Sequence, residues 1–328
     1  MPRFDLPVDA LRAYRPDVAE PGDFDAFWTS TLAESRALAE PPRLTRVASP
    51  LTAFEVYDVS FSGFGGDPVG GWFIVPAGAD QPLPAIVEYN GYGGGRGLPH
   101  ERLAWAASGY AYFLMDTRGQ GSVWGTGGET ADPHGTGPSA PGFMTRGIED
   151  PATYYYRRVF TDAVLAIDAV RSFDRVDADR VAACGGSQGG GIAIAAAGLS
   201  SGLVGAMPEV PFLCHFERAV GLTDRFPYQE IVQYLSVHRD AAPRAFETLA
   251  YFDGVNLAKR ATAPALFSVG LMDPVCPPST VYAARNHWGA GASADIVEYA
   301  FNEHEGGAAA HWQRQSAWLA ERLVRSMA

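Results

Sequence analysis

The chain has 328 residues, of which 47% are hydrophobic and 19% are charged, as in a globular protein with a substantial core. The formal net charge is −12, from 25 basic and 37 acidic residues, which argues against nucleic acid as a partner. We expect a soluble protein with an acidic, solvated surface.

The cysteines, Cys184, Cys214 and Cys276, cannot form a complete set of disulfides and no C-x-x-C occurs, so we expect buried, reduced thiols. The first residues lack a basic segment followed by an apolar one, and no apolar run approaches the length of a membrane span. These features predict a cytoplasmic protein that does not associate with a membrane.

Residues 1–50 are rich in proline and charge, and we interpret them as an N-terminal extension. Apolar residues recur at helical spacing from Phe24 to Leu32, behind Asp23 as a candidate N-cap, which predicts a helix docked on the main body. Apolar residues broken by glycines between positions 53 and 75 predict two antiparallel strands.

Further along the chain, segments typical of strands and of helices alternate. The predicted segments are strand 85–89, helix 99–108, strand 110–115, helix 152–172, strand 180–184, helix 188–199, strand 205–212, strand 265–269, helix 278–288, strand 296–299 and helix 308–326. This alternation predicts an α/β fold with a mostly parallel central sheet and helices on both faces.

Two stretches interrupt the alternation. Residues 116–150 form a long glycine- and proline-rich connection, and we expect an interface between subunits within 121–150. Residues 213–261, after the sixth predicted strand, combine helical segments with many aromatic residues, which favours an insertion that lines a pocket. No linker separates these parts, so we predict a single domain over residues 1–328.

The stretch Gly185-Gly-Ser-Gln-Gly189 joins a predicted strand to a predicted helix and fits G-x-S-x-G, the nucleophile elbow of α/β-hydrolases. Ser187 would stand on a sharp turn, where side chains at Gly185 or Gly189 would collide with neighbouring backbone. Glycine-rich turns are also common without any catalytic role, so the motif needs support from the rest of the chain.

A base and an acid follow in the order that α/β-hydrolases use. Asp273 comes directly after the predicted strand 265–269, and His304 lies between the last strand and the last helix. Because ligand sites of parallel sheets form at the carboxyl ends of strands, we predict that both meet Ser187. Asp273 before Pro274 also suits a simple turn, and an isolated histidine is more often structural than catalytic.

In this arrangement His304 would take the Ser187 proton during attack on an acyl carbon, and Asp273 would orient the imidazole. The N–H of Gln188 and the loop around Tyr92 are the candidate donors to the oxyanion. No H-E-x-x-H occurs, and two glycines separate His304 from His311, so we expect no structural or catalytic metal.

The chain resembles the acetyl xylan esterase / cephalosporin C deacetylase family of α/β-hydrolases over nearly its whole length. The segments that carry this resemblance are Phe24-Asp-Ala-Phe-Trp28, Gly91-Tyr-Gly-Gly-Gly-Arg-Gly97, Asp116-Thr-Arg-Gly-Gln-Gly121, Pro141-Gly-Phe-Met-Thr-Arg-Gly147, Tyr154-Tyr-Tyr-Arg-Arg158, Gly185-Gly-Ser-Gln-Gly189, Val210-Pro-Phe-Leu-Cys-His-Phe216, Gly270-Leu-Met-Asp-Pro-Val-Cys-Pro-Pro278 and His304-Glu305. Arg118-Gly-Gln120 together with the serine elbow and His-Glu is far more specific than any one motif.

The resemblance implies deacetylation of small acetylated sugars and of cephalosporin C, inside the cell, without a cofactor, by a ring-like hexamer. It assigns Ser187, Asp273 and His304 to the triad and Tyr92 and Gln188 to the oxyanion hole. Arg118 and Gln120 would brace the elbow as structural residues. By the same similarity, the small acyl pocket is formed by Phe212, Pro227 and Tyr228.

The sequence departs from the family at Asn90, where members often have histidine. Two other functions remain open at this stage. One is a different small-ester hydrolase, or an amidase or peptidase, on the same fold, although no propeller-sized domain precedes the hydrolase part. The other is a catalytically inactive hydrolase that serves as a binding protein.

Overall fold

The computed structural model describes residues 4–135 and 137–325. Within them a nine-stranded sheet has the strand order β1-β2-β3-β5-β4-β6-β7-β8-β9. The strands are β1 Arg43–Arg46, β2 Phe54–Ser62, β3 Pro68–Pro76, β4 Leu83–Tyr89, β5 Ala111–Met115, β6 Val176–Gly186, β7 Gly205–Glu209, β8 Ala265–Gly270 and β9 Ala294–Tyr299. Strands β4 to β9 are parallel, and β1 to β3 form an antiparallel edge.

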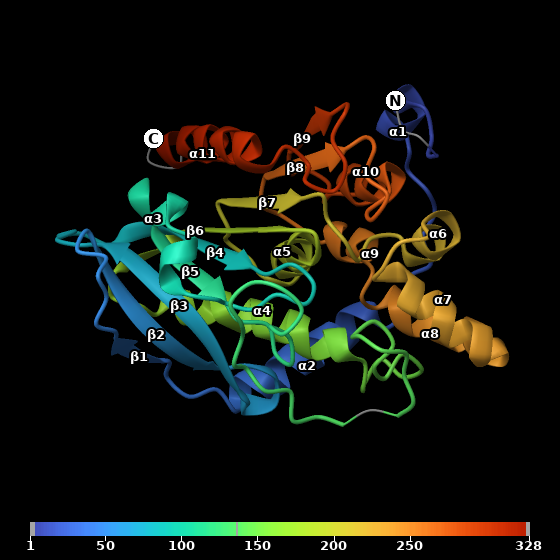
Figure 1. The fold of residues 1–328 in the computed structure, drawn as a ribbon, viewed down its shortest axis with the longest axis horizontal. Coiled ribbons are helices and arrows are strands. Elements are labelled where there is room, and N and C mark those ends of the chain that lie inside the picture. The colour runs from blue at the N-terminus through green and yellow to red at the C-terminus, as the bar shows by residue number, and fades with distance from the viewer. Residues whose placement is uncertain (1–3, 136, 326–328) are drawn as a thin grey trace.

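Helices cover both faces of this sheet (Figure 1). They are α1 Val8–Arg12, α2 Phe24–Ala37, α3 Ala104–Ala107, α4 Tyr155–Arg171, α5 Gln188–Leu199, α6 Phe216–Leu222, α7 Tyr228–Val237, α8 Ala242–Ala250, α9 Gly254–Ala258, α10 Pro278–Asn286 and α11 Ala308–Arg325, with 3-10 turns at Phe64–Gly66, Pro99–Glu101 and Arg239–Ala241. The expected mostly parallel sheet with helices on both faces is therefore confirmed.

Burial on both faces explains why the central strands are continuously apolar. In β4, Ile86 packs in the apolar cluster under α3 and α11, whereas its neighbour Val87 packs in the larger cluster formed with α4 and α5. Figure 1 shows α3 and α11 above the sheet and α4 below it. Because successive strand residues point to opposite faces, each strand supplies both clusters.

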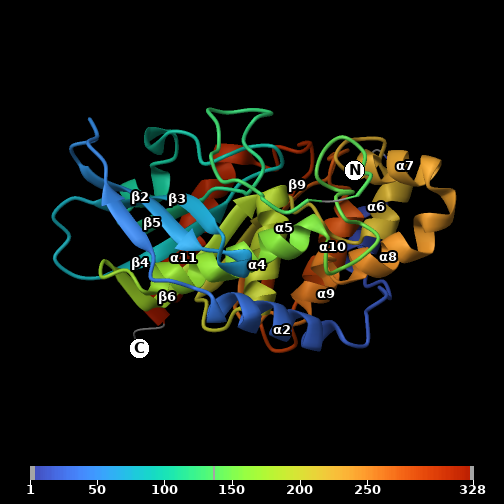
Figure 2. The same ribbon diagram turned by 90° about the horizontal axis from the view of Figure 1, so that it is seen from below.

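The N-terminal extension packs against the main body, as expected, and Figure 2 shows α2 alongside α4. Leu11 and Trp28 are buried in the larger apolar cluster, and the Trp28 indole donates to the Tyr251 carbonyl (3.0 Å). Asp23 is the N-cap residue of α2, as predicted, but its carboxylate accepts from the Tyr251 hydroxyl (2.5 Å) and bonds to no N–H of the helix.

Several boundaries differ from the sequence prediction. Strand β1 lies within the extension, and the expected helix 99–108 is a 3-10 turn followed by the four-residue α3. The insertion 213–261 contains α6 to α9 and follows β7, the sixth strand that the sequence indicated. The predicted end of the last helix at residue 326 lies outside the described residues. All three cysteines are free and buried, as expected.

None of the helices described in residues 4–135 and 137–325 combines the length and the apolar character that crossing a membrane requires.

Candidate active site

Ser187 stands on the tight turn that joins β6 to α5. Its backbone has φ 57° and ψ −118°, a conformation that residues other than glycine rarely adopt. A Cβ on Gly189 would lie 2.1 Å from the Tyr89 carbonyl oxygen, and one on Gly185 would lie 2.6 Å from the Gly189 carbonyl carbon. The elbow therefore requires glycine on both sides of the serine, as the motif predicted.

The three residues predicted from the strand ends lie together. His304 Nε2 is 2.9 Å from Ser187 Oγ, and His304 Nδ1 is 2.8 Å from Asp273 Oδ2. An ionised carboxylate only accepts hydrogen bonds, so the proton belongs on Nδ1 and Nε2 is left to accept from the serine hydroxyl. The His304 side chain is 31% exposed, whereas that of Asp273 is fully buried.

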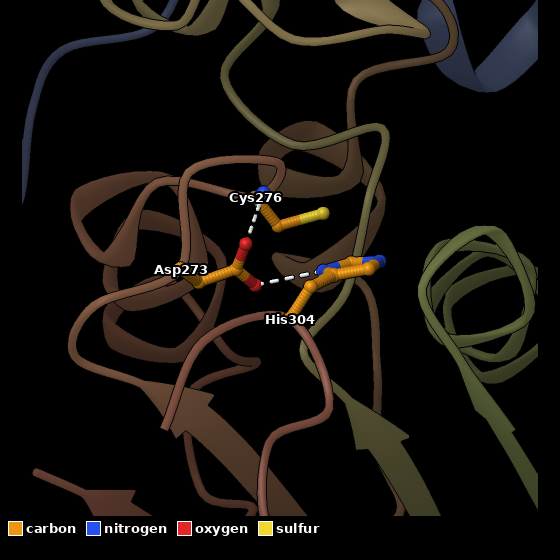
Figure 3. A group of neighbouring side chains, drawn as sticks. All are labelled: Asp273, Cys276 and His304. Atoms are coloured by element: carbon orange, nitrogen blue, oxygen red, sulfur yellow. Dashed lines mark hydrogen bonds and ion pairs between the residues drawn. The ribbon is translucent and has the colours of Figure 1, made fainter. Parts of the chain in front are cut away.

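Asp273 is held from the side opposite to the imidazole. Its Oδ1 accepts hydrogen bonds from the backbone N–H groups of Val275 (2.7 Å) and Cys276 (2.9 Å), in the turn that follows β8. Figure 3 shows the carboxylate between this turn and His304. These bonds satisfy a carboxylate oxygen that is shielded from water and keep the side chain aimed at Nδ1.

The candidate oxyanion donors lie next to the elbow. Gln188 is the first residue of α5, so its N–H belongs to the helix N-terminus, where N–H groups have no partner within the helix. Tyr92 is half-buried in the loop that follows β4. A Cβ on Gly91 would lie 3.9 Å from the Gly186 carbonyl oxygen, so this loop runs beside the elbow.

Gln188 and Gln120 form a buried network behind the serine. Gln120 Nε2 donates to Gln188 Oε1 (2.9 Å), which also accepts from the Tyr156 hydroxyl (2.9 Å). Gln188 Nε2 lies 3.2 Å from the Asn90 carbonyl oxygen, and Gln120 Oε1 accepts from Gly93 N–H (2.7 Å). The network joins the elbow to the Tyr92 loop and so fixes the distance between the two candidate donors.

Sequence reasoning missed Glu230, a buried residue of α7. The Tyr92 hydroxyl donates to Glu230 Oε1 (2.5 Å) and accepts from Phe143 N–H (2.6 Å), while Glu230 Oε2 accepts from Met144 N–H (2.9 Å). Burial, reinforced by the adjacent glutamate, raises the pKa of Tyr92, and burial raises the pKa of Glu230. The insertion and the 141–147 stretch therefore both position the Tyr92 side chain. Glu230 of the insertion lies more than a hundred residues after Tyr92 in the sequence.

Cys276 is the second residue that sequence reasoning left without a role. Burial raises the pKa of its thiol well above the usual range, while an interaction with the Ser187 side chain lowers this pKa to a smaller extent. The signal for its position was the turn Asp273-Pro-Val-Cys276, which returns the chain toward the aspartate.

The predicted acyl-pocket residues Phe212, Pro227 and Tyr228 are all buried. The rings of Phe212 and Tyr228 are in edge contact, with centroids 4.3 Å apart. The Phe212 ring also packs edge-on against the Tyr92 ring, with centroids 6.3 Å apart. Asn90 is buried as well, and its amide donates to the Met115 carbonyl (2.7 Å), so it links the ends of β4 and β5.

Glu209, at the end of β7, predicts a pH-dependent stability. Its backbone carbonyl accepts from Ser187 N–H (2.9 Å), and burial raises the pKa of its carboxyl from 4.5 to about 7. Between these values the folded protein binds more protons than the unfolded chain, so this contribution to stability is complete below pH 4.5 and is lost as the pH rises toward 7.

Glu209→Gln removes the ionisation and should raise stability by roughly 1–3 kcal/mol more at pH 8 than at pH 4, because one pKa unit corresponds to about 1.4 kcal/mol. Denaturant unfolding at both pH values measures this, and an equal effect at both would contradict it.

Comparison with known proteins is consistent with this geometry. The family model described as Acetyl xylan esterase (AXE1) matches residues 1–322. The acetyl xylan esterase from Paenibacillus sp. R4 is 40% identical, with a TM-score of 0.89 over 96% of this chain and 99% of that protein. Acetyl Xylan Esterase 1 from Thermoanaerobacterium sp. JW/SL YS485 is 32% identical, with a TM-score of 0.87 over 97% of this chain and 99% of its own.

A curated relative, Acetyl esterase Axe7A of Xylanibacter ruminicola, is 27% identical over 281 residues, which is 83% of this chain. The present chain spans 61% of the length of that relative. The match along the chain and the parallel sheet together confirm the α/β-hydrolase fold and the resemblance noted from the motifs. The chain belongs to the acetyl xylan esterase family of carboxylic ester hydrolases.

Proposed function

We propose that this protein is a serine esterase that removes acetyl groups from small acetylated sugars such as xylo-oligosaccharides. The observation that carries the proposal is the continuous hydrogen-bonded chain from Ser187 Oγ through His304 to Asp273, with distances of 2.9 Å and 2.8 Å. This is the arrangement needed for a nucleophile, a general base and a group that orients the base.

In the proposed mechanism the Ser187 hydroxyl attacks the acetyl carbonyl carbon while His304 Nε2 accepts its proton. The imidazolium then donates this proton to the leaving sugar oxygen, and the acetyl-enzyme is formed. Water, deprotonated by His304, hydrolyses it to acetate and restores the serine. The backbone N–H groups of Tyr92 and Gln188 stabilise the tetrahedral oxyanion, a contribution worth about 3 kcal/mol per donor.

The aromatic packing around the elbow supports a preference for short acyl groups. Phe212 and Tyr228 are fully buried and in contact with each other, so the space beside the elbow is closed by rigid rings. In this proposal Phe212, Pro227 and Tyr228 limit the depth of the acyl pocket, with Tyr92 packed against Phe212. Longer chains would have to displace buried aromatic rings.

A cavity of about 430 Å³ supports a sugar as the leaving group. Its lining includes Met272 and Pro274, which flank Asp273, and Glu303, which precedes His304. The lining combines apolar side chains such as Leu222 with charged ones, and the exposed Arg225 guanidinium can donate hydrogen bonds to hydroxyl groups. Apolar surface beside such polar groups suits the two faces of a sugar ring.

The proposal predicts a steep dependence on acyl length. Hydrolysis of p-nitrophenyl esters should fall by about tenfold or more from C2 to C8, because the closed acyl pocket lacks room for the added methylenes. Initial rates over C2, C4, C6 and C8 measure this, followed by acetylated xylan fragments and cephalosporin C, which we include among the substrates. Faster turnover of C8 than of C2, or of aminoacyl anilides than of acetyl esters, would overturn the proposal.

We further propose that the protein is a cytoplasmic homohexamer with an interface in the 121–150 loop. Val123 and Trp124 in this loop are 71% and 46% exposed, although both are large apolar side chains that association would bury. The three unpaired, buried cysteines suit a reducing compartment. Size-exclusion chromatography with light scattering measures the mass directly, and a monomer would contradict the hexamer.

Glu230→Gln tests how the insertion positions the Tyr92 loop. The substitution preserves the side-chain shape but weakens the bonds to Tyr92 and Met144, so kcat for p-nitrophenyl acetate should fall by about 10- to 100-fold with KM changed far less. Gln233→Ala, on an exposed position of the same helix, is the matched control. An unchanged kcat with Glu230→Gln would show that the loop holds its position without this carboxylate.

A further inference from the structure

A group of three potential metal ligands surrounds the candidate base. Asp273, Cys276 and His304 offer a carboxylate oxygen, a thiol sulfur and an imidazole nitrogen, all within 4.8 Å of one another. Figure 3 shows the Cys276 side chain extending from the turn after β8 alongside the His304 ring. An interaction with the Ser187 side chain lowers the pKa of the Cys276 thiol, so the sulfur lies close to the serine that contacts His304 Nε2.

The electronic state of His304 suits metal coordination. Asp273 accepts from Nδ1 (2.8 Å) and thereby leaves a lone pair on Nε2, the same carboxylate–histidine arrangement that orients imidazole ligands in zinc proteins. Sulfur and imidazole are ligands that Zn²⁺ prefers, and separations below 5 Å require only small side-chain movements to reach bonds of about 2.0–2.3 Å. Ser187 Oγ, 2.9 Å from Nε2, is positioned as a third donor.

We propose that Cys276 and His304, together with Ser187, form a binding site for a thiophilic divalent cation such as Zn²⁺, and that its occupation reversibly inhibits the enzyme. On binding, the thiol releases its proton to solvent and sulfur and Nε2 each donate an electron pair to the ion. The base is then no longer free to accept the serine proton. The inhibition rests on the proposed catalytic role of His304, whereas the binding itself does not.

Direct binding is measured with Cd²⁺, whose bond to a thiolate gives an ultraviolet charge-transfer band. We expect one equivalent to saturate this band in the unmodified protein, and Cys276→Ser to remove it. Cys214→Ser is the matched control, because Cys214 is equally buried but not part of this ligand group, and it should retain the band. His304→Ala should weaken binding by roughly 10- to 100-fold. A band that survives Cys276→Ser, or that Cys214→Ser removes, overturns the site.

Inhibition is measured with p-nitrophenyl acetate over a Zn²⁺ titration. Zn²⁺ should inhibit, chelator should restore the rate, and Cys276→Ser should raise the half-inhibitory concentration by about tenfold or more. Mg²⁺, which prefers oxygen ligands, should have no effect at the same concentrations. Equal sensitivity of both proteins to Zn²⁺ overturns the inhibition mechanism. An absence of esterase activity would refute the proposed function alone, since the Cd²⁺ band is independent of turnover.

Discussion

Ser187→Ala is expected to lower kcat for p-nitrophenyl acetate by about 10⁶-fold. Without the hydroxyl no acyl-enzyme forms, and His304 has no proton to accept from a bound nucleophile. What remains is the stabilisation of the oxyanion, which can still favour attack by water to a small extent. Steady-state kinetics and labelling by a fluorophosphonate probe measure the loss, since the probe reacts only with an activated serine.

Two further variants test whether the loss of activity is specific to the candidate site. Asp273→Asn should lower kcat by about 10⁴-fold, because an amide no longer holds the Nδ1–H tautomer of His304. Ser236→Ala, at an exposed position of α7, should leave kcat unchanged. The melting temperature of the Ser187 variant should stay within a few degrees of the parent, since the turn depends on its glycines and backbone bonds. Retained activity in a folded Ser187→Ala protein would eliminate the serine mechanism.

Arg118→Ala is expected to cost about 3–5 kcal/mol of the free energy of unfolding. The Arg118 side chain is fully buried, and its guanidinium binds Asp162 through two hydrogen bonds (2.6 and 2.8 Å) and Asp67 through one (2.9 Å). Removing it leaves the buried Asp162 carboxylate without its cation, although Phe64 N–H still donates to it (2.8 Å). Denaturant unfolding followed by circular dichroism measures the loss.

Arg36→Ala is the control for this effect. Arg36 pairs with Asp168 at a similar distance (2.9 Å), but both side chains are exposed, so its loss should cost less than about 1 kcal/mol. Equal losses of unfolding free energy for the two substitutions would show that the buried ion pairs of Arg118 contribute no more than an exposed pair. Because Gln120 follows in the same loop and contacts Gln188, Arg118→Ala should also lower kcat in the protein that remains folded.

The fold class followed from local patterns, because the alternation of apolar strands and helices restricts the chain to a parallel sheet with helices on both faces. The prediction that Ser187, Asp273 and His304 meet rested on the same logic. Each follows a strand, and parallel strands end at a common edge, so order along the chain was sufficient to bring them together. The glycines of the elbow were informative since no other residue fits there.

The strand order and the surroundings of the site required the tertiary structure. Glu230 is separated from Tyr92 by more than a hundred residues, and no local pattern distinguishes its carboxylate from that of the exposed Glu247 on α8. The thiol of Cys276 likewise has an apolar neighbourhood in sequence, which indicates only burial. Contacts of this kind depend on how the insertion and the turn after β8 pack on the sheet. Local sequence therefore determined the candidate triad, whereas long-range packing decided what holds the Tyr92 loop and which side chain lies beside His304.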